Sequence, residues 1–153
     1  MMMDRLFNSR FENSLRLLIL LDEFDMPQTI DMLYATDFMA LYSKAFGLTE
    51  TNLNGDNNYK FSEFASQREL VKEALQELVL NGTVEAVGYK KGLSYVITPE
   101  GEDLCETLDS DYANEYRENA KAVITSIAGK SERALIAEIY KLSKQSLREE
   151  AVQ

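Results

Sequence analysis

The strongest constraint on the fold comes from Thr83–Leu104, TVEAVGYKKGLSYVITPEGEDL, in which two alternating apolar and polar runs flank a short basic turn. Alternation with a period of two predicts a β-hairpin whose turn is supplied by Lys90-Lys91-Gly92. The residues expected to face inward are Val84, Ala86, Tyr95 and Ile97. Thr98-Pro99 then predicts a helix start, because threonine caps a helix and proline fits its first turn. Many winged-helix domains leave their wing in this way.

Three helices are predicted before this hairpin. Apolar residues at helical spacing place the first at about residues 13–24 and the second at about residues 29–46. The third opens on a capping box of Ser66 with Glu69, or earlier near Ser62, and it ends at Asn81-Gly82, which is typical helix-terminating chemistry. Three helices followed by a hairpin is the order of elements in a winged helix.

Helical patterns continue after the hairpin, and the helix that starts at Thr98-Pro99 could kink or restart at Asp109-Ser110-Asp111. One segment runs from about residue 112 to 128, and a last one from about 131 to 149. We therefore predict a mainly α-helical chain with a small β-hairpin. In this interpretation residues 1–112 form a winged helix-turn-helix domain that includes the N-terminal helix, and residues 113–153 form a C-terminal helical extension.

The composition excludes several kinds of chemistry. The chain of 153 residues has no histidine, which removes the commonest general base and the Ser-His and Cys-His nucleophile pairs. It has one cysteine, so zinc sites of the usual Cys/His kind are excluded as well. Asp22, Glu23 and Asp25 are better explained as a charged helix end than as a metal cluster. We expect no enzyme activity, no cofactor and no metal site.

The single cysteine also bears on the compartment. Cys105 cannot form an internal disulfide, which indicates a reducing environment. The N-terminal residues contain no apolar run of the kind found in a signal peptide. The longest apolar run, LRLLILL at Leu15–Leu21, is far shorter than the ~20 residues of a membrane span. We therefore predict a cytoplasmic protein without membrane contact.

Whether the predicted winged helix binds DNA depends on its charges. The net charge is −10, and a lone acidic domain is repelled by phosphate backbones. The polar face of the third helix carries four acids against two bases, Arg68 and Lys72, whereas a helix that reads the major groove normally shows the reverse balance. At the wing tip, Lys90 and Lys91 could contact a phosphate or an acidic partner. These four residues are the candidate contacts for nucleic acid or a partner.

A protein interface is the other candidate site. The first helix is so apolar that it is expected to be buried on most sides or to pack against a partner chain. Two tyrosines that follow the wing could extend such a surface. The candidate interface residues are Leu17, Leu21, Phe24, Tyr112 and Tyr116.

The pattern as a whole resembles the middle component of bacterial ABC-three-component systems, a group that includes the Lamassu-type anti-phage and anti-plasmid defence systems. The resemblance covers about Leu15 to Tyr116. Its most specific pieces are the opening LLILLDEFDMP, the loop NLNG, and the ending YVITPEG with LDSDYANEY. None of these is a catalytic motif.

The resemblance implies a small accessory subunit without catalysis of its own. Its partners would be an SMC-like ATPase and an effector, often a nuclease, and DNA would be contacted only within the complex, if at all. The alternative from the residues alone is a winged-helix DNA-binding transcriptional regulator. A further alternative is an acidic inhibitory protein that mimics the charge of DNA.

Overall fold

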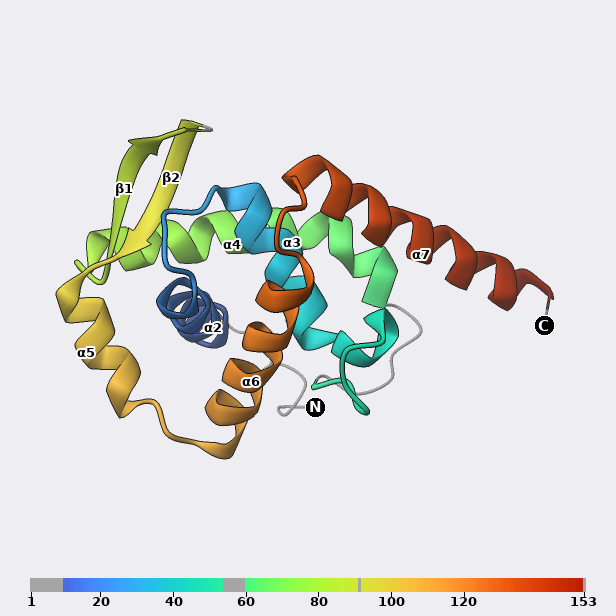
Figure 1. Ribbon diagram of the computed structural model, residues 1–153, viewed down its shortest axis with the longest axis horizontal. Coiled ribbons are helices and arrows are strands. Elements are labelled where there is room, and N and C mark those ends of the chain that lie inside the picture. The colour runs from blue at the N-terminus through green and yellow to red at the C-terminus, as the bar shows by residue number, and fades with distance from the viewer. Residues whose placement is uncertain (1–9, 54–59, 91, 153) are drawn as a thin grey trace.

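The computed structural model describes residues 10–53, 60–90 and 92–152 (Figure 1). Within these residues the chain is mainly helical with one small two-stranded antiparallel sheet, as predicted. In order, the elements are α2 (Arg10–Glu23), α3 (Ile30–Leu41), the 3-10 turn η1 (Ser43–Phe46), α4 (Lys60–Leu80), β1 (Val84–Tyr89), β2 (Gly92–Ile97), α5 (Pro99–Thr107), α6 (Asp111–Ser126) and α7 (Glu132–Val152).

Helix α2 lies at the centre of the molecule. Helices α3, α4, α5 and α6 all pack against it, and Figure 1 shows it nearly end-on with α4 running across above it. Its residues 17–21 are at most 2% exposed. The sequence left open whether this apolar run is covered internally or by a partner. The helices of the chain itself cover it, and one hydrophobic core results.

The helix starts after the hairpin follow the predicted capping chemistry. The Thr98 hydroxyl accepts a hydrogen bond from the Gly101 N–H at 3.1 Å, and Pro99 is the first residue of α5. The sequence predicted a possible restart of the helix near Ser110. The Ser110 hydroxyl does cap α6 there, accepting from the Ala113 N–H at 3.1 Å. Local signals were therefore sufficient to locate both helix starts.

The end of α4 is also as predicted. Gly82 adopts the left-handed conformation with φ of 82°. Its N–H donates to the Val79 carbonyl, and the Thr83 N–H donates to the Leu78 carbonyl at 3.1 Å. These two bonds form a Schellman motif, which satisfies carbonyls at the helix end and turns the chain into β1.

The hairpin differs in one respect from the sequence prediction. Val84 is buried and pairs with Ile97, but Ala86, predicted to face inward, is exposed. Ala86 pairs with Tyr95, and its short side chain lies on β1, the outer strand of the sheet. On the other side of β2, Gln28 forms an antiparallel bridge with Tyr95, with N–H to carbonyl distances of 2.8 and 3.0 Å. The segment between α2 and α3 therefore adds a third extended piece beside the hairpin.

Two helix boundaries were predicted wrongly. The second helix ends at Leu41 rather than Phe46, and η1 follows it. Helix α4 begins at Lys60, close to the earlier of the two predicted starts, so the capping-box residue Ser66 lies inside the helix. The physical reason is burial ahead of the cap: Phe64 is 1% exposed and stacks on Tyr34 with 4.4 Å between ring centroids. Packing of this ring favours helix over the local capping signal.

The C-terminal helices belong to the same core as the rest. The predicted boundary between residues 112 and 113 falls inside α6, and buried residues of α6 and α7 join the central cluster. Leu135 and Ile139 anchor α7 at 0% exposure, while Figure 1 shows its far end running out from the body. Within the described residues no helix is both long and apolar enough to span a membrane.

Candidate functional site

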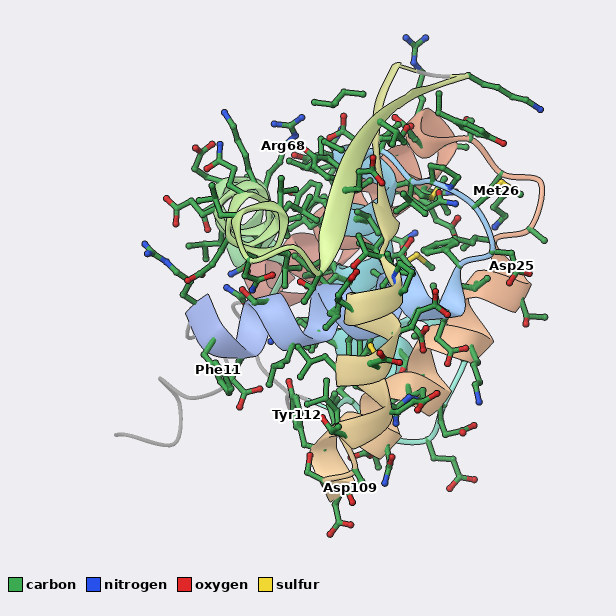
Figure 2. All side chains as sticks on the ribbon, turned by 90° about the vertical axis from the view of Figure 1, so that its left-hand side faces the viewer. Phe11, Asp25, Met26, Arg68, Asp109 and Tyr112 are labelled. Carbon is green, nitrogen blue, oxygen red and sulfur yellow. The ribbon has the colours of Figure 1, made fainter. Side chains whose placement is uncertain are left out.

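The structure does not gather the predicted basic residues into one cluster. Arg68 and Lys72 lie on successive turns of α4, and Lys90 lies at the tip of the hairpin, with its ammonium 6.0 Å from the centre of the Tyr89 ring. Lys91 lies outside the described residues. The Arg68 side chain (Figure 2) is already engaged: its Nε donates to Asp31 Oδ1 at 2.8 Å, and this bond raises the pKa of the guanidinium.

The charges around these bases are mainly negative. Glu69, Glu73 and Glu77 lie on α4 with Arg68 and Lys72, and all five side chains are exposed or half-buried. Because Arg68 is paired with a carboxylate of α3, Lys72 is the base on this face for which the structure records no ion pair. A duplex phosphate would therefore meet more repulsion than attraction on α4.

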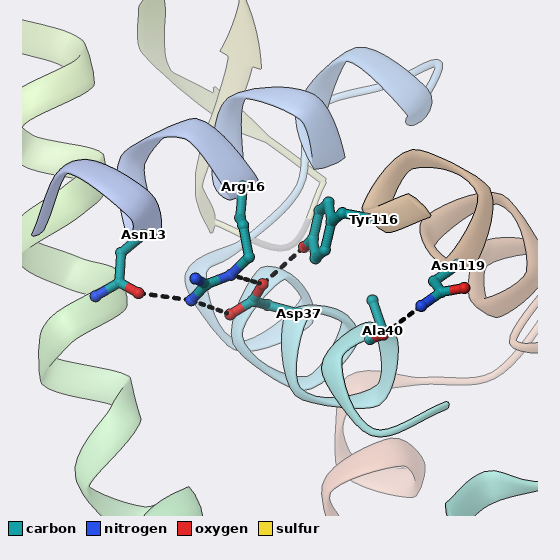
Figure 3. Close-up of polar contacts among 6 residues, drawn as sticks. All are labelled: Asn13, Arg16, Asp37, Ala40, Tyr116 and Asn119. Atoms are coloured by element: carbon teal, nitrogen blue, oxygen red, sulfur yellow. Dashed lines mark hydrogen bonds and ion pairs between the residues drawn. The ribbon is translucent and has the colours of Figure 1, made fainter. Parts of the chain in front are cut away.

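A charged network lies in the interior instead (Figure 3). Arg16 of α2 and Asp37 of α3 are 2% and 4% exposed. The Arg16 Nε donates to Asp37 Oδ1 at 3.1 Å, and its Nη2 donates to Asn13 Oδ1 at 2.5 Å. Tyr116 of α6 donates its hydroxyl to the same Asp37 oxygen at 2.7 Å. One carboxylate therefore joins three helices.

This network explains the pKa directions in the core. Asp37 holds the Arg16 guanidinium charged, and burial together with the Asp37 charge raises the pKa of the Tyr116 hydroxyl well above its ordinary value. A second link lies one turn further along α6, where the Asn119 amide donates to the Ala40 carbonyl at 3.1 Å. The arrangement orients helices and brings no reactive group to the surface.

The sequence analysis missed this ion pair. Its signal was a charge inside each of two apolar segments: Arg16 within LRLLILL, and Asp37 within IDMLYATDFMAL. A buried charge requires an opposite partner, because an unpaired one costs several kcal/mol, a large part of a typical net stability of about 5–15 kcal/mol. Taken together, Arg16 and Asp37 indicate that α2 and α3 pack against each other where these two residues lie.

The predicted interface residues need correction. Leu17 and Leu21 are each 1% exposed and Tyr116 is 0% exposed, all within the core of this chain. Their apolar character is explained by internal packing, so we do not carry them into a surface. Phe24 and Tyr112 are half-buried and keep part of their side chains at the surface.

Cys105 is held as an unreactive thiol. Its residue is 2% exposed, and burial raises the pKa of the thiol from 9.0 to about 12. At pH 8 the folded chain should hold roughly a thousandfold less thiolate than the unfolded chain. We therefore expect a thiol reagent to modify the native protein slowly and the denatured protein rapidly. Equal rates would contradict this burial.

The same shift sets a direction for the pH dependence of stability. Because the folded pKa is raised, the unfolded thiol ionises first as the pH rises. The Cys105 contribution to the free energy of unfolding is therefore complete below the unfolded pKa of 9.0 and decreases between there and about 12. Denaturation curves at pH 8 and pH 10.5 measure the loss, and Cys105→Ala should reduce it.

The chain was compared with known families, curated proteins and solved structures. The model of the family described as "ABC-three component (ABC-3C) system Middle Component 2" matches residues 6–149. The chain belongs to this family. No curated protein and no solved structure matches it. A middle component is an accessory part of a multi-subunit system, as the resemblance implied.

Because the chain belongs to a multi-subunit system, its exposed surfaces are candidate sites for binding other subunits. Within residues 10–53, 60–90 and 92–152 there is no group of three or more Asp, Glu, Cys or His residues arranged to hold a metal ion. The acids at Asp22 and Glu23 instead lie at the end of α2, where burial raises the pKa of Glu23 and nearby Lys121 opposes that shift.

Proposed function

We propose that this middle component is a non-catalytic adaptor that couples an SMC-like ATPase to a nuclease-type effector. The system would be a cytoplasmic anti-phage or anti-plasmid defence complex of the Lamassu type. The observation that carries the proposal is the family match over residues 6–149. An adaptor of this kind needs a rigid body with binding surfaces rather than a reaction centre.

The interior of the chain supports a structural role. Its buried charges, Arg16 and Asp37, neutralise each other and join helices. Its one cysteine is buried and kept protonated. These buried groups are therefore committed to packing.

The finer fold proposal is a winged helix. Helices α2, α3 and α4 are followed by the β1–β2 hairpin, and the bridge from Gln28 to Tyr95 adds a short extended piece between the first two helices. This alternation of three helices, one short strand and a two-stranded wing is the arrangement of winged helix-turn-helix domains. Fold alone does not specify function, and such domains bind proteins as well as DNA.

The alternative, a DNA-binding transcriptional regulator, is not favoured. In that role α4 would enter the major groove, but its acids outnumber its bases and Arg68 is paired with Asp31 at 2.8 Å. We expect the isolated chain to leave duplex DNA unshifted even at low salt. A salt-dependent shift that is lost on Lys90→Glu with Lys91→Glu would revive the regulator.

Part of the predicted site remains in the proposal as partner contacts. Lys90 and Lys91 at the hairpin tip, and Lys72 on α4, are suited to acidic segments of another subunit. Arg68 could exchange Asp31 for an external carboxylate. Phe24 and Tyr112 would contribute apolar contact area.

Co-purification tests the adaptor proposal. The three genes of the system are expressed together with an affinity tag on the middle component, and the eluate is separated by gel filtration. We expect the ATPase subunit, the effector subunit, or both, to elute with it at higher apparent mass. Elution of the middle component alone, with both other subunits present in the lysate as folded protein, would end the proposal.

A further inference from the structure

One end of the molecule exposes large apolar side chains around a groove. Phe11, at the first turn of α2, is 70% exposed, and Figure 2 shows it at the free end of that helix. The groove beside it has a volume of about 370 Å³ and is lined by Leu15, Leu78 and Leu104, among others, from α2, α4 and α5. Apolar side chains gathered around a hollow mark a binding surface more often than single exposed ones do.

A second hollow continues this groove along α4. It has a volume of about 320 Å³, shares Arg10 and Glu77 with the first, and adds Leu80. Leu80 is 87% exposed, although the other large apolar residues of α4 from Phe64 onward are buried or half-buried. In the wall of the first hollow, the Ser14 hydroxyl has no hydrogen-bond partner among the described residues. In the free chain this region therefore has an exposed apolar side chain at Leu80 and a polar hydroxyl at Ser14 that lacks a hydrogen bond within the described residues.

The rim of the groove is acidic. Glu73 and Glu77 lie one turn apart on α4 and line the hollows, and both are exposed or half-buried. The base at this rim, Arg10, is 3.8 Å from Glu73 in an exposed pair that contributes little. The groove therefore combines an apolar floor with carboxylates along its α4 side.

The lining residues also restrict the form of an occupant. They come from three helices and the residue after α4, so the groove offers no strand edge to which an extended peptide could pair. An incoming segment must satisfy its own backbone hydrogen bonds, as a helix does. Carboxylates at the rim favour lysine or arginine beside the apolar anchors of that helix.

We infer that this groove, between the start of α2, the end of α4 and α5, receives a basic amphipathic helix from another subunit of the system. The inference rests on the proposed adaptor function and specifies the kind of partner segment that this adaptor would bind. The anchors would be apolar residues at i, i+3 or i+4 and i+7, seated between Phe11, Leu80 and Leu104, with basic residues facing Glu73 and Glu77.

Surface substitutions test the groove without disturbing the core. Phe11→Glu and Leu80→Glu change side chains that are 70% and 87% exposed, and Leu93→Glu is the matched control, because Leu93 is 63% exposed on the hairpin. The probes are the purified ATPase and effector subunits, titrated onto each full-length variant by calorimetry. We expect each groove variant to weaken the affinity at least tenfold and the control to stay within twofold of wild type.

Charge reversal provides an independent arm. Glu73→Lys with Glu77→Lys should weaken the same complex and flatten its salt dependence, because the rim carboxylates would no longer attract a basic helix. Glu115→Lys with Glu118→Lys on α6 is the control with the same change in net charge. If both pairs weaken binding equally, net charge rather than the groove is responsible and the inference is overturned.

The outcomes separate this inference from the proposed function. If the wild-type chain binds neither subunit, the adaptor proposal fails. If it binds and the groove variants bind equally well, only the groove inference fails. A wild-type dimer that Leu80→Glu dissociates in light scattering would identify a second copy as the occupant and overturn the inference. So would hydrogen exchange showing the groove protected in the free chain and unchanged in the complex, since residues of the chain itself would then fill it.

Discussion

Asp37→Ala is expected to lower the free energy of unfolding by about 3–5 kcal/mol, the usual cost of removing one partner of a buried ion pair. The substitution leaves the Arg16 guanidinium, 2% exposed, without its carboxylate, and it removes the acceptor of the Tyr116 hydroxyl. Both losses act on the contacts among α2, α3 and α6. Urea denaturation followed by circular dichroism measures the change.

The matched control removes both charges. Arg16→Met combined with Asp37→Leu leaves no uncompensated charge in the core, so it should recover at least half of the stability that Asp37→Ala loses. Recovery is partial because Tyr116 and Asn13 still lose a partner. A loss below about 1 kcal/mol for Asp37→Ala, the level of an exposed pair, would show that the network does not hold the helices together.

Gly101→Ala is expected to destabilise the chain by about 3 kcal/mol, the upper end of the usual cost of overpacking. A Cβ atom at this position would lie 2.2 Å from the Thr83 carbonyl oxygen and 2.7 Å from the Ile97 Cγ1. The obstacle is backbone, so it cannot move aside as a flexible side chain would. Helix α5 would have to shift, which would strain the bond from the Thr98 hydroxyl to the Gly82 carbonyl at 2.7 Å.

Whether Gly101→Ala lowers or raises the stability of the chain distinguishes the effect of steric packing from the effect of helix propensity. In an ordinary helix, glycine to alanine stabilises by about 1 kcal/mol. Gly88→Ala on β1 is the control, because a Cβ there meets nothing within 4 Å. Thermal denaturation should place Gly101→Ala far below wild type and Gly88→Ala close to it. Stabilisation by Gly101→Ala would contradict the close approach of α5 to the hairpin.

Much of the fold follows from local sequence signals. Thr98-Pro99, Asn81-Gly82 and Ser110 each use chemistry that acts within a few residues, and each marks a helix end in the structure. The hairpin register follows from alternation and a short turn. These elements could be predicted because their stability depends little on the rest of the chain.

The failures occur where packing overrides local preference. Ser66 has the sequence pattern of a helix cap, but α4 begins before it, at Lys60, because the burial of Phe64 favours helix there. Ala86 has the alternation of an inward residue, but its side chain is exposed on the outer strand β1. Helix bounds and side-chain burial at such positions depend on contacts with residues that are distant in the sequence, and local sequence patterns do not reveal those contacts.

The candidate site was predicted less well than the fold. The acidic balance of α4 was visible in the sequence, and it is the reason for expecting the isolated chain not to bind DNA. The burial of Leu17, Leu21 and Tyr116 was not, because an apolar helix at a core and one at an interface have the same pattern. Exposure of Phe11 and Leu80 likewise required the packing of three helices, since neither residue differs in kind from its buried neighbours.

The central claim is that the middle component joins the other two subunits, and bridging tests it most directly. The tagged ATPase subunit is immobilised and the purified effector subunit is added with and without the middle component, in the absence of DNA. The proposal predicts that the ATPase retains the effector only when the middle component is present, and that Leu80→Glu in the middle component abolishes this retention while Leu93→Glu does not. Equal retention of the effector with and without the middle component would contradict the adaptor function.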